Sequence, residues 1–410
     1  MSEPLTIAYL TSLYARSSDS FVRAEVAALR ALGHTVHTFS IRRPPASELV
    51  SDAVRAEHDR TDYVLSHGLR TFCASLLRMA GVRPVALARA AALTIRIGQP
   101  GARGRLWPLA YLAEAAYLAE QLERMGVQHL HDHIAEGSAS VALLASELSG
   151  VPFSVTVHGP GEFDHPDALA LDVKLAHASF FVAISSFARS QVLRWTRPGD
   201  WERVHVVRCG VEQRYLERSP APLPEAPRFV SIGRLDVQKG QLVLLEAIAR
   251  ARSEGLAVEL TLVGDGPLRE QLEDAASRLD IRDAVRFAGA LAADDVLAEI
   301  ERSRALVLAS FAEGLPIVAM EALALGRPVI ATDVGALAEL VEPGRTGWLV
   351  PPAAVEPLAD AIRAAASAPV PELERMGEAG AARVRERHDS AREARRLEAL
   401  FRESVARGKP

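Results

Sequence analysis

Short apolar segments alternate with amphipathic ones along most of this chain. Residues 5–10 predict a first strand, a polar loop follows over 12–20, and a helix from about Ser20 to Leu32 ends at Gly33, before a second, alternating strand. Strand, loop, helix, glycine and strand make one βαβ unit. The loop therefore lies at the carboxyl edge of a parallel sheet, where its serines either hold a phosphate or cap the following helix.

This alternation forms two series. The first continues with a helix around 108–125 and a strand, V-P-F-S-V-T-V, that ends at His158. The second begins with R-F-V-S-I-G, after the segment S-P-A-P-L-P-E-A-P at 219–227. Four prolines in nine residues cannot continue a helix or a sheet, so they predict a stiff linker. The pattern predicts an α/β fold of two doubly wound, Rossmann-like domains, residues 1–218 and 228–387, that face each other across a cleft.

A glutamate interrupts the most apolar helix of the second series. Residues 317–325 predict a buried helix with Glu321 in its middle. A buried carboxylate needs donors, which are either Arg327 or another protein group, or the two hydroxyls of a ligand diol. Glu313 lies in the glycine turn that joins the strand at 305–309 to this helix. That turn is at the carboxyl edge of a sheet, where anions and nucleotides bind.

Two cations lie in the first strand-to-helix loop of the second series, S-I-G-R-L-D-V-Q-K-G. Arg234 and Lys239 converge there with the N-terminus of the next helix, which predicts a diphosphate as the ligand. The alternative is a pair of solvated side chains. Lys239 is one of three lysines among 47 basic residues, and its place in this loop favours a function. The glycines of V-G-D-G-P-L also allow a ligand to approach the backbone, while the missing third glycine argues against a dinucleotide oxidoreductase.

The stretch E-G-L-P-I-V-A-M-E, in which seven residues separate Glu313 from Glu321, resembles the two-glutamate signature of retaining GT-B glycosyltransferases of family 4. The segment S-S-D-S-F-V-R-A-E-V-A-A-L-R-A-L-G-H-T-V is similar to that of exopolysaccharide and colanic-acid-type glycosyltransferases, although it lacks the glycine-glycine loop of many relatives. Ala336 likewise replaces a commoner glycine. The resemblance implies that a C-terminal helix, about residues 388–410, crosses back to the N-terminal domain.

The resemblance also implies roles for particular residues. Glu321 is expected to hold the ribose hydroxyls of a nucleotide-sugar donor, and Glu313 and His158 are expected to face the transferred sugar. The predicted catalytic residues are His158, Glu313, Arg234 and Lys239, and the predicted donor-binding residues are Glu321, Gly233, Gly264, Gly266, Phe287, Gly314, Leu315, Ile317 and Val318. The residues expected on the acceptor side are Ser17, Ser18, Asp19, His131, Glu162, Asp164 and Arg189.

Residues 63–113 contain no Asp or Glu but carry seven arginines between apolar runs. Such a region either lies against an anionic membrane, where each basic side chain contributes about 1 kcal/mol, or its arginines are solvated or pair with acids elsewhere in the fold. Together with the resemblance to polysaccharide enzymes, it is the predicted place of docking to a lipid-linked acceptor. The arginines are Arg70, Arg78, Arg83, Arg89, Arg96, Arg103 and Arg105.

Composition and the remaining motifs restrict the partners. A net charge of −5 argues against nucleic-acid binding. Only Cys73 and Cys209 are available, so no disulfide framework is expected. The three histidines of H-L-H-D-H either bind a metal or serve as hydrogen-bonding residues of a cleft; we expect no metal, because no Asp-x-Asp pair is present to hold one. Neither a secretion signal nor a transmembrane segment is expected, which favours the cytoplasm, free or peripheral on the inner face of the plasma membrane.

The resemblance, which these observations support, implies a glycosyltransferase of cell-surface polysaccharide biosynthesis, and the family alone implies that it retains the configuration of the sugar. It is expected to move a sugar from a UDP- or GDP-linked donor to a glycan or polyprenyl-diphosphate-linked acceptor, without a cofactor. Two alternatives stay open. A nucleotide-sugar epimerase or hydrolase of the same fold would convert the donor without an acceptor, and a non-catalytic, membrane-associated partner would bind no nucleotide.

Overall fold

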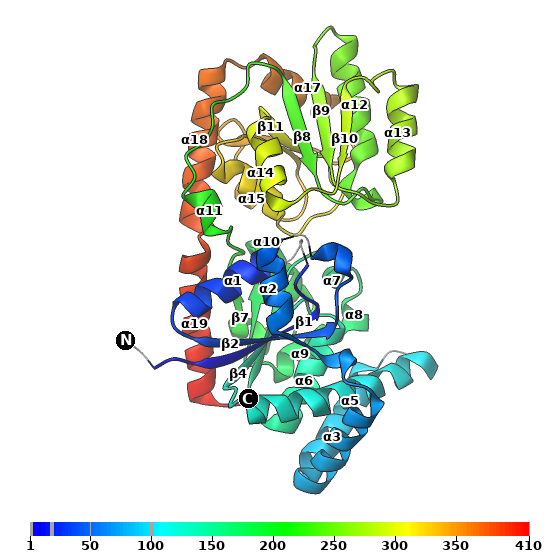
Figure 1. Cartoon of the computed structure of the whole chain (residues 1–410), viewed down its shortest axis with the longest axis vertical. Coiled ribbons are helices and arrows are strands. Elements are labelled where there is room, and N and C mark those ends of the chain that lie inside the picture. The colour runs from blue at the N-terminus through cyan, green and yellow to red at the C-terminus, as the bar shows by residue number, and fades with distance from the viewer. Residues whose placement is uncertain (1–2, 17–19, 50, 99–101, 410) are drawn as a thin grey trace. The chain divides into compact units, whose positions relative to one another are not determined.

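The computed structural model describes residues 3–16, 20–49, 51–98 and 102–409, without the side chains of residue 47 and of residues 102–107. The chain divides into two compact units, residues 1–209 with 390–410, and residues 210–389 (Figure 1). Each unit has its own sheet, and all strand pairs in the described ranges are parallel. The predicted α/β fold of two doubly wound domains is confirmed.

The first unit contains a seven-stranded sheet in the order β3-β2-β1-β4-β5-β6-β7. The strand order runs one way from β1 to β3 and the other way from β4 to β7, so β1 and β4 flank the switch point of the sheet. The strands are β1 (Thr6–Leu13), β2 (Thr35–Arg42), β3 (Thr61–Tyr63), β4 (His129–His133), β5 (Phe153–Val157), β6 (Phe180–Ala183) and β7 (Val204–Val206).

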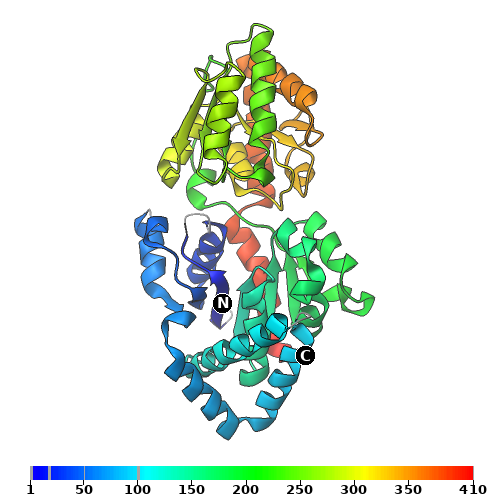
Figure 2. The same ribbon diagram turned by 90° about the vertical axis from the view of Figure 1, so that its right-hand side faces the viewer.

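Helices cover both faces of this sheet. α1 (Ser20–Ala31) packs against α19 (Ser390–Arg407) on one face, while α6 (Gly137–Ser149) and α5 (Ala102–Arg124) lie on the other (Figure 1). α3 (Leu69–Val82) and α4 (Pro84–Ile97) pack on α5 and α6 and form the blue to cyan layer of Figure 2. The other helices are α2 (Asp52–Arg60), α7 (Pro160–Asp164), α8 (Pro166–Leu169), α9 (Leu171–His177) and α10 (Ser186–Arg194).

The second unit contains a six-stranded sheet in the order β10-β9-β8-β11-β12-β13, with its switch point between β8 and β11. The four residues of β11, A-L-V-L, are all buried, as expected for a parallel strand covered on both faces. The strands are β8 (Arg228–Ile232), β9 (Glu259–Val263), β10 (Val285–Gly289), β11 (Ala305–Leu308), β12 (Val329–Thr332) and β13 (Gly347–Val350).

Two groups of helices cover the second sheet. α12 (Gln241–Ser253) packs against α13 (Arg269–Arg278) and α17 (Val355–Ser367), while α15 (Ile317–Ala324) packs against α18 (Val370–Arg387). The shorter α11 (Gln213–Leu216) contacts both α15 and α18. The remaining helices are α14 (Ala293–Glu301) and α16 (Leu337–Leu340).

The boundaries of the units differ from the predicted domain boundaries. The chain passes between the units at residues 209–210, and the proline-rich segment 219–227 lies inside the second unit. The reason is the buried Arg327, whose guanidinium donates to the carbonyl oxygens of Ala221 at 2.9 Å and Pro222 at 3.1 Å. Pattern alone did not show this contact, because Arg327 is distant in the sequence.

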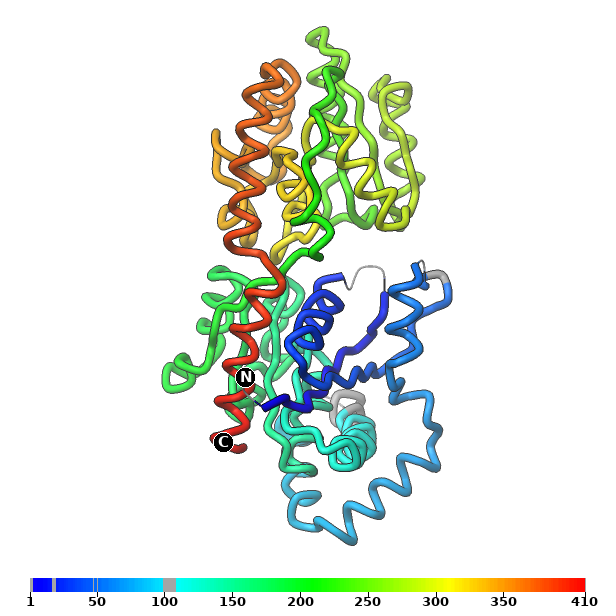
Figure 3. The backbone as a smooth tube through the Cα atoms, turned by 60° about the vertical axis from the view of Figure 1, so that its left-hand side comes forward, coloured from blue at the N-terminus to red at the C-terminus, as the bar shows by residue number. Residues whose placement is uncertain are grey.

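The C-terminal helical segment is divided between the units. α18 ends at Arg387 in the second unit, and α19 begins at Ser390 in the first. Leu397 and Phe401 of α19 are fully buried in the core of the first unit, and Arg402 donates to the carbonyl oxygen of Glu3 at 2.9 Å. Figure 3 shows α19 at the red end of the tube, beside the start of the chain. α19 is therefore an integral helix of the first unit.

Within the described part of the chain, no helix combines the length and the apolar character that crossing a membrane requires.

Candidate active site

The loops that follow β8 and β11 leave the switch point of the second sheet. Residues 233–240 join β8 to α12, and residues 309–316 join β11 to α15. Chains that turn to opposite faces of a parallel sheet leave a crevice at the carboxyl ends of the strands, and ligands of open α/β sheets bind there. These two loops carry Lys239 and Glu313.

A charged pair joins the two loops. Nζ of Lys239 donates to Oε1 of Glu313 at 2.7 Å, and the hydroxyl of Ser310 donates to the same oxygen at 2.6 Å. The side chain of Glu313 is 6% exposed and that of Lys239 is 24% exposed. Both donors use Oε1, and no described residue donates to Oε2. One oxygen of a nearly buried carboxylate thus stays available to a ligand, beside an ammonium group that reaches solvent.

Glycines let two further loops, which follow β9 and β12, approach these loops at backbone contact. Gly264, at a φ of 131°, would place a Cβ 2.0 Å from the carbonyl oxygen of Gly233, and Gly335, at a φ of 59°, would place one 1.9 Å from the carbonyl oxygen of Glu313. Any larger residue at either position would displace the loop that it faces. The N–H of Ala336 donates to the carbonyl oxygen of Gly314 at 3.0 Å, and its own φ of −102° needs no glycine. The replacement of the family's second glycine is therefore compatible with this turn.

Glu321 lies half-buried in α15, with an aromatic and a basic neighbour. The hydroxyl of Tyr215 is hydrogen-bonded to its carboxyl group. Burial, and next the negative charge of Glu212, raise the pKa of Glu321 to about 7, while Arg214 and Tyr215 act in the opposite direction. Arg327 was one of the alternative partners of Glu321, but its guanidinium binds carbonyl oxygens of the proline-rich segment instead.

The predicted catalytic residue Arg234 and the other predicted donor-binding residues have varied surroundings. Arg234 is 71% exposed, with its Nε 3.7 Å from Oδ2 of Asp236. Phe287 lies on the edge strand β10, where the guanidinium of Arg282 stands 5.4 Å from the centre of its ring. Gly266 packs against the backbone of residue 235. Leu315 is buried, and Ile317 and Val318 are partly buried at the start of α15.

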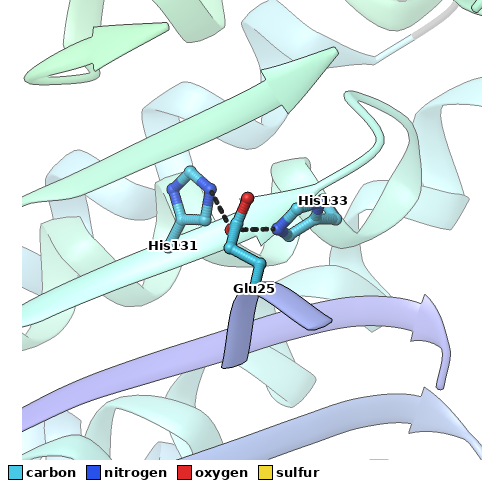
Figure 4. A group of neighbouring side chains, drawn as sticks. All are labelled: Glu25, His131 and His133. Atoms are coloured by element: carbon cyan, nitrogen blue, oxygen red, sulfur yellow. Dashed lines mark hydrogen bonds and ion pairs between the residues drawn. The ribbon is translucent and has the colours of Figure 1, made fainter. Parts of the chain in front are cut away.

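At the switch point of the first sheet, the side chains of β4 meet α1. Oε1 of Glu25 lies 3.1 Å from Nε2 of His133 and 4.0 Å from Nε2 of His131 (Figure 4). These three residues bring atoms of the types that bind metals within 4.8 Å of one another. The same atoms share hydrogen bonds: His131 is fully buried, with Nδ1 2.7 Å from the hydroxyl of Ser154 and Nε2 2.8 Å from that of Thr156.

A cavity of about 200 Å³ borders this cluster at the carboxyl ends of β1 and β4. Its lining includes His133, Phe21 and Thr11, and the buried hydroxyl of Thr11 has no hydrogen-bond partner among the described residues. Ile134 at the cavity has a φ of 75°, which is rare for a β-branched residue. Strained backbone of this kind clusters at binding sites.

Two buried charged groups hold the strained turn in place. Glu162 accepts from the N–H groups of Ala135 and His158, both at 2.6 Å, and from that of Gly159 at 2.9 Å. Nζ of Lys174 donates to the carbonyl oxygen of Ala135 at 2.8 Å. Burial raises the pKa of Glu162 to about 7 and lowers that of Lys174 to about 8. Glu162 thus binds backbone on both sides of His158, and its oxygens do not face solvent.

Solved structures share this architecture, and two family models match the sequence. The structure resembles the crystal structure of HepE from Anabaena in complex with UDP, with a TM-score of 0.72 at 18% identity over 98% of this chain and 100% of that one. It also resembles sucrose-phosphate synthase from Thermosynechococcus elongatus, with a TM-score of 0.74 at 22% identity over the same shares. A family model described as Glycosyltransferase Family 4 matches residues 19–214, and one described as glycosyl transferases group 1 matches residues 226–367. The chain belongs to the GT-B glycosyltransferases of family 4.

Relatives of this glycosyltransferase are found among polysaccharide enzymes. The putative colanic acid biosynthesis glycosyltransferase WcaL of Salmonella typhimurium is 31% identical over 157 residues, which are 37% of this chain and 39% of that protein. The amylovoran biosynthesis glycosyltransferase AmsK of Erwinia amylovora is 30% identical over 38% of this chain and 40% of its own length. The chain thus spans about two fifths of the length of these relatives.

The structure of the glycosyltransferase separates the predicted acceptor-side residues. Asp164 is exposed, whereas Nε of Arg189 donates to the carbonyl oxygen of Val204 at 3.0 Å and His131 is enclosed by hydroxyls. Glu162 supports the backbone, as described above. Ser17, Ser18 and Asp19 lie outside the described residues.

Sequence reasoning missed several residues of both sites. Glu25 and Tyr215 lie in an ordinary amphipathic helix and a short helix, and no local pattern relates them to His133 or Glu321. The rarity of lysine, which drew attention to Lys239, applies equally to Lys174 and was the one signal that could have found it.

Proposed function

We propose that this chain transfers a sugar from a nucleotide-diphosphate donor, UDP- or GDP-linked, to a glycan or polyprenyl-diphosphate-linked acceptor in cell-surface polysaccharide biosynthesis. The observation that carries the proposal is the Lys239–Glu313 pair at the switch point of the second sheet. Glu321 lies in α15, the helix that follows the loop of Glu313. The relatives named for colanic acid and amylovoran biosynthesis support the polysaccharide pathway. The complex of HepE with UDP supports a uridine nucleotide.

The charges of the second unit fit a nucleotide sugar. The ammonium group of Lys239 can neutralise the diphosphate as it leaves with the electron pair of the broken sugar–oxygen bond. Oε2 of Glu313 can accept a hydroxyl of the sugar, and the carboxylate of Glu321 can accept both hydroxyls of a ribose. The new bond forms between the anomeric carbon and the acceptor oxygen, which loses its proton to an oxygen of the departing diphosphate. Retention of configuration is proposed from the resemblance to the retaining enzymes.

A turnover assay tests this proposal. Purified protein is incubated with UDP- and GDP-sugars and a polyprenyl-diphosphate-linked glycan, and released nucleoside diphosphate is measured. We expect release that depends on the acceptor and falls about 10²- to 10³-fold in Lys239→Ala. Arg250→Ala is the matched control, because Arg250 is an exposed base of α12 that pairs with Glu254 and Glu356.

Two outcomes would contradict the proposal. Rapid conversion of the donor without any acceptor would favour an epimerase or a hydrolase, and the absence of turnover and of nucleotide binding would favour a non-catalytic partner. The anomeric proton coupling of the product, measured by NMR, tests retention separately.

We also propose that α3 and α4 dock on an anionic membrane, which places the protein peripherally on the inner face of the plasma membrane. Ten large hydrophobic side chains are exposed in the described part of the chain, and seven of them lie between residues 65 and 109. Leu69, Leu77 and Ile95 are 77%, 75% and 81% exposed. The seven are Leu65, Leu69, Leu77, Val82, Val85, Ile95 and Leu109.

Arginines follow the apolar positions of this surface. Arg70, Arg78 and Arg96 each come directly after an exposed Leu or Ile and are themselves exposed. Arg78 pairs with Glu120 at 2.7 Å, whereas Arg70 and Arg96 have no acidic partner among the described residues. The alternative that arginines of residues 63–113 pair with acids elsewhere in the fold therefore holds for Arg78. The unpaired arginines and the apolar side chains together suit anionic lipid headgroups above an acyl layer.

Vesicle sedimentation tests this surface. We expect binding to vesicles of phosphatidylcholine with phosphatidylglycerol, weaker binding to phosphatidylcholine alone, and a large loss in Leu77→Glu with Ile95→Glu. Each basic contact contributes about 1 kcal/mol, so Arg70→Ala with Arg96→Ala should weaken binding about tenfold or more. Arg345→Ala, an exposed base of the second unit, is the control. Equal sedimentation of all variants would contradict the proposal.

A further inference from the structure

A line of hydrogen-bonded side chains runs through the first unit to His158. It begins at Tyr9, whose hydroxyl donates to Oε1 of Glu25 at 2.6 Å. The same oxygen lies 3.1 Å from Nε2 of His133, and Nδ1 of His133 lies 2.9 Å from Nε2 of His158. Nδ1 of His158 lies 3.9 Å from Sγ of Cys209. Figure 4 shows the central part of this line, where Glu25 of α1 reaches the histidines of β4.

The position of each proton follows from the groups at the Glu25 end. Burial, and next the charge of Glu25, raise the pKa of Tyr9 well above its usual value, so its hydroxyl keeps the proton that it donates. Oε1 of Glu25 is therefore an acceptor. Because His133 contacts this same oxygen, its Nε2 carries a proton.

The second nitrogen of His133 then determines the state of His158. His133 is 1% exposed and is packed against the rings of Tyr9, His131 and His158. A neutral His133 with a proton on Nε2 can only accept at Nδ1, so Nε2 of His158 donates to it. Burial lowers the pKa of His158 well below its usual value, and its neutral ring therefore has a lone pair on Nδ1.

We propose that Glu25 and His133 are positioning residues that hold His158 in the Nε2–H tautomer, with Nδ1 directed as an acceptor toward a hydroxyl of the substrate. For a neutral His133 the tautomer follows from these hydrogen bonds, and only the hydroxyl rests on the proposed function. Burial raises the pKa of the Cys209 thiol, so it faces Nδ1 as a thiol, a weak donor at a long distance. A hydroxyl at ordinary hydrogen-bond distance would replace it with a gain in binding.

Histidine-selective ¹⁵N labelling of the full chain tests the tautomer without any substrate. Long-range ¹⁵N–¹H spectra report which ring nitrogen carries the proton, and His158→Asn and His133→Asn assign the signals. We expect His133 and His158 both to be protonated on Nε2 alone. A wild-type His158 protonated on Nδ1, or a His133 protonated on both nitrogens, would overturn the proposal.

Glu25→Gln tests the part played by the carboxylate. The amide of the glutamine can donate to Nε2 of His133, which then carries its proton on Nδ1 and reverses the tautomer of His158. We expect the signals of His158 to shift toward the Nδ1–H form in Glu25→Gln and to stay unchanged in Glu57→Gln, a partly buried carboxyl outside this line. Unchanged signals in Glu25→Gln would contradict the positioning role.

Kinetics separate the tautomer from the use of Nδ1. In a turnover assay we expect Glu25→Gln to raise KM or lower kcat at least tenfold relative to Glu57→Gln. If the tautomer reverses while KM and kcat stay equal in the two variants, the proposed contact between Nδ1 of His158 and a substrate hydroxyl is overturned. If the wild-type tautomer is as expected but no sugar is transferred, the proposed function fails and the positioning role stands.

Discussion

Two buried glutamates illustrate how surroundings decide the role of a residue. Glu162 has its oxygens occupied by three backbone N–H groups, whereas both donors to Glu313 share one oxygen. The first arrangement fixes a turn, and the second leaves acceptor capacity for a ligand. Sequence reasoning found both acids and assigned both to substrates. It could not distinguish them, because one donor of Glu162, the N–H of Ala135, comes from another loop, and the pairing of Glu313 with Lys239 joins two loops.

The pKa of Glu321 leads to a prediction for the pH dependence of donor binding. In the proposed donor complex a ribose diol donates to the ionised carboxylate of Glu321. The pKa of this carboxyl group is about 7, with Glu212, Arg214 and Tyr215 facing it. We therefore expect the affinity for a nucleoside diphosphate to rise between pH 6 and pH 8 and to become nearly independent of pH in Glu321→Gln. Isothermal titration calorimetry across this range provides the measurement. An unchanged pH profile in the variant would contradict the role of Glu321.

The raised pKa of Glu321 also makes the free energy of unfolding depend on pH. The folded-state pKa of Glu321 lies above that of an exposed carboxyl, so the folded protein binds more protons than the unfolded chain between these two values. Ionisation of Glu321 therefore lowers the free energy of unfolding as the pH rises toward 7.

At the scale of elements, the loops after β8 and β11 act as one assembly. Both were predicted from strands that end in glycine turns before helices, and Glu313 and Lys239 were placed in them. Their pairing was not predictable, because it depends on the neighbourhood of β8 and β11 in the sheet. The approach of Gly335 to Glu313 was equally hidden, since no sequence pattern reports a contact between the backbones of two loops.

Gly335→Ala tests this assembly. A Cβ there would lie 1.9 Å from the carbonyl oxygen of Glu313, so the loop that carries the carboxylate must move. We expect the free energy of unfolding to fall by about 1–3 kcal/mol and the affinity for a nucleotide sugar to fall with it. Chemical denaturation and calorimetry measure the two effects.

Gly344→Ala is the matched control. Gly344 has a φ of 73°, close to that of Gly335, but nothing lies within 4 Å of its Cβ position. This variant experiences the backbone strain of about 1 kcal/mol without displacing a loop. Equal loss of nucleotide affinity in the two variants would show that the contact with Glu313 has no effect.

At the scale of the whole molecule, each unit has a complete sheet and its own core. The repeated strand and helix pattern predicted this, because apolar periodicity is a local property. The unit boundaries were not predictable, since they depend on Arg327 contacts with residues more than 100 positions away. The resemblance to family 4, and not the apolar pattern, placed the last helix with the first unit.

The core role of α19 leads to a prediction for the first unit. Phe401 is fully buried against the rings of His129, His131 and Phe180. We expect Phe401→Ala to lower the free energy of unfolding of the first unit by about 3–5 kcal/mol. Arg407→Ala, at an exposed position of the same helix, should change it by less than about 0.5 kcal/mol. Calorimetric unfolding gives the comparison, and equal transitions would contradict the core role.

Nucleotide binding by the second unit is the decisive test of the proposed donor site. Isothermal titration calorimetry with UDP and GDP is performed on the wild type, Lys239→Ala and Arg250→Ala. We predict that at least one nucleotide binds the wild type and Arg250→Ala equally well and binds Lys239→Ala at least about tenfold more weakly, a difference of about 1.4 kcal/mol. Binding of neither nucleotide to the wild type, or equal binding to all three proteins, would contradict the account.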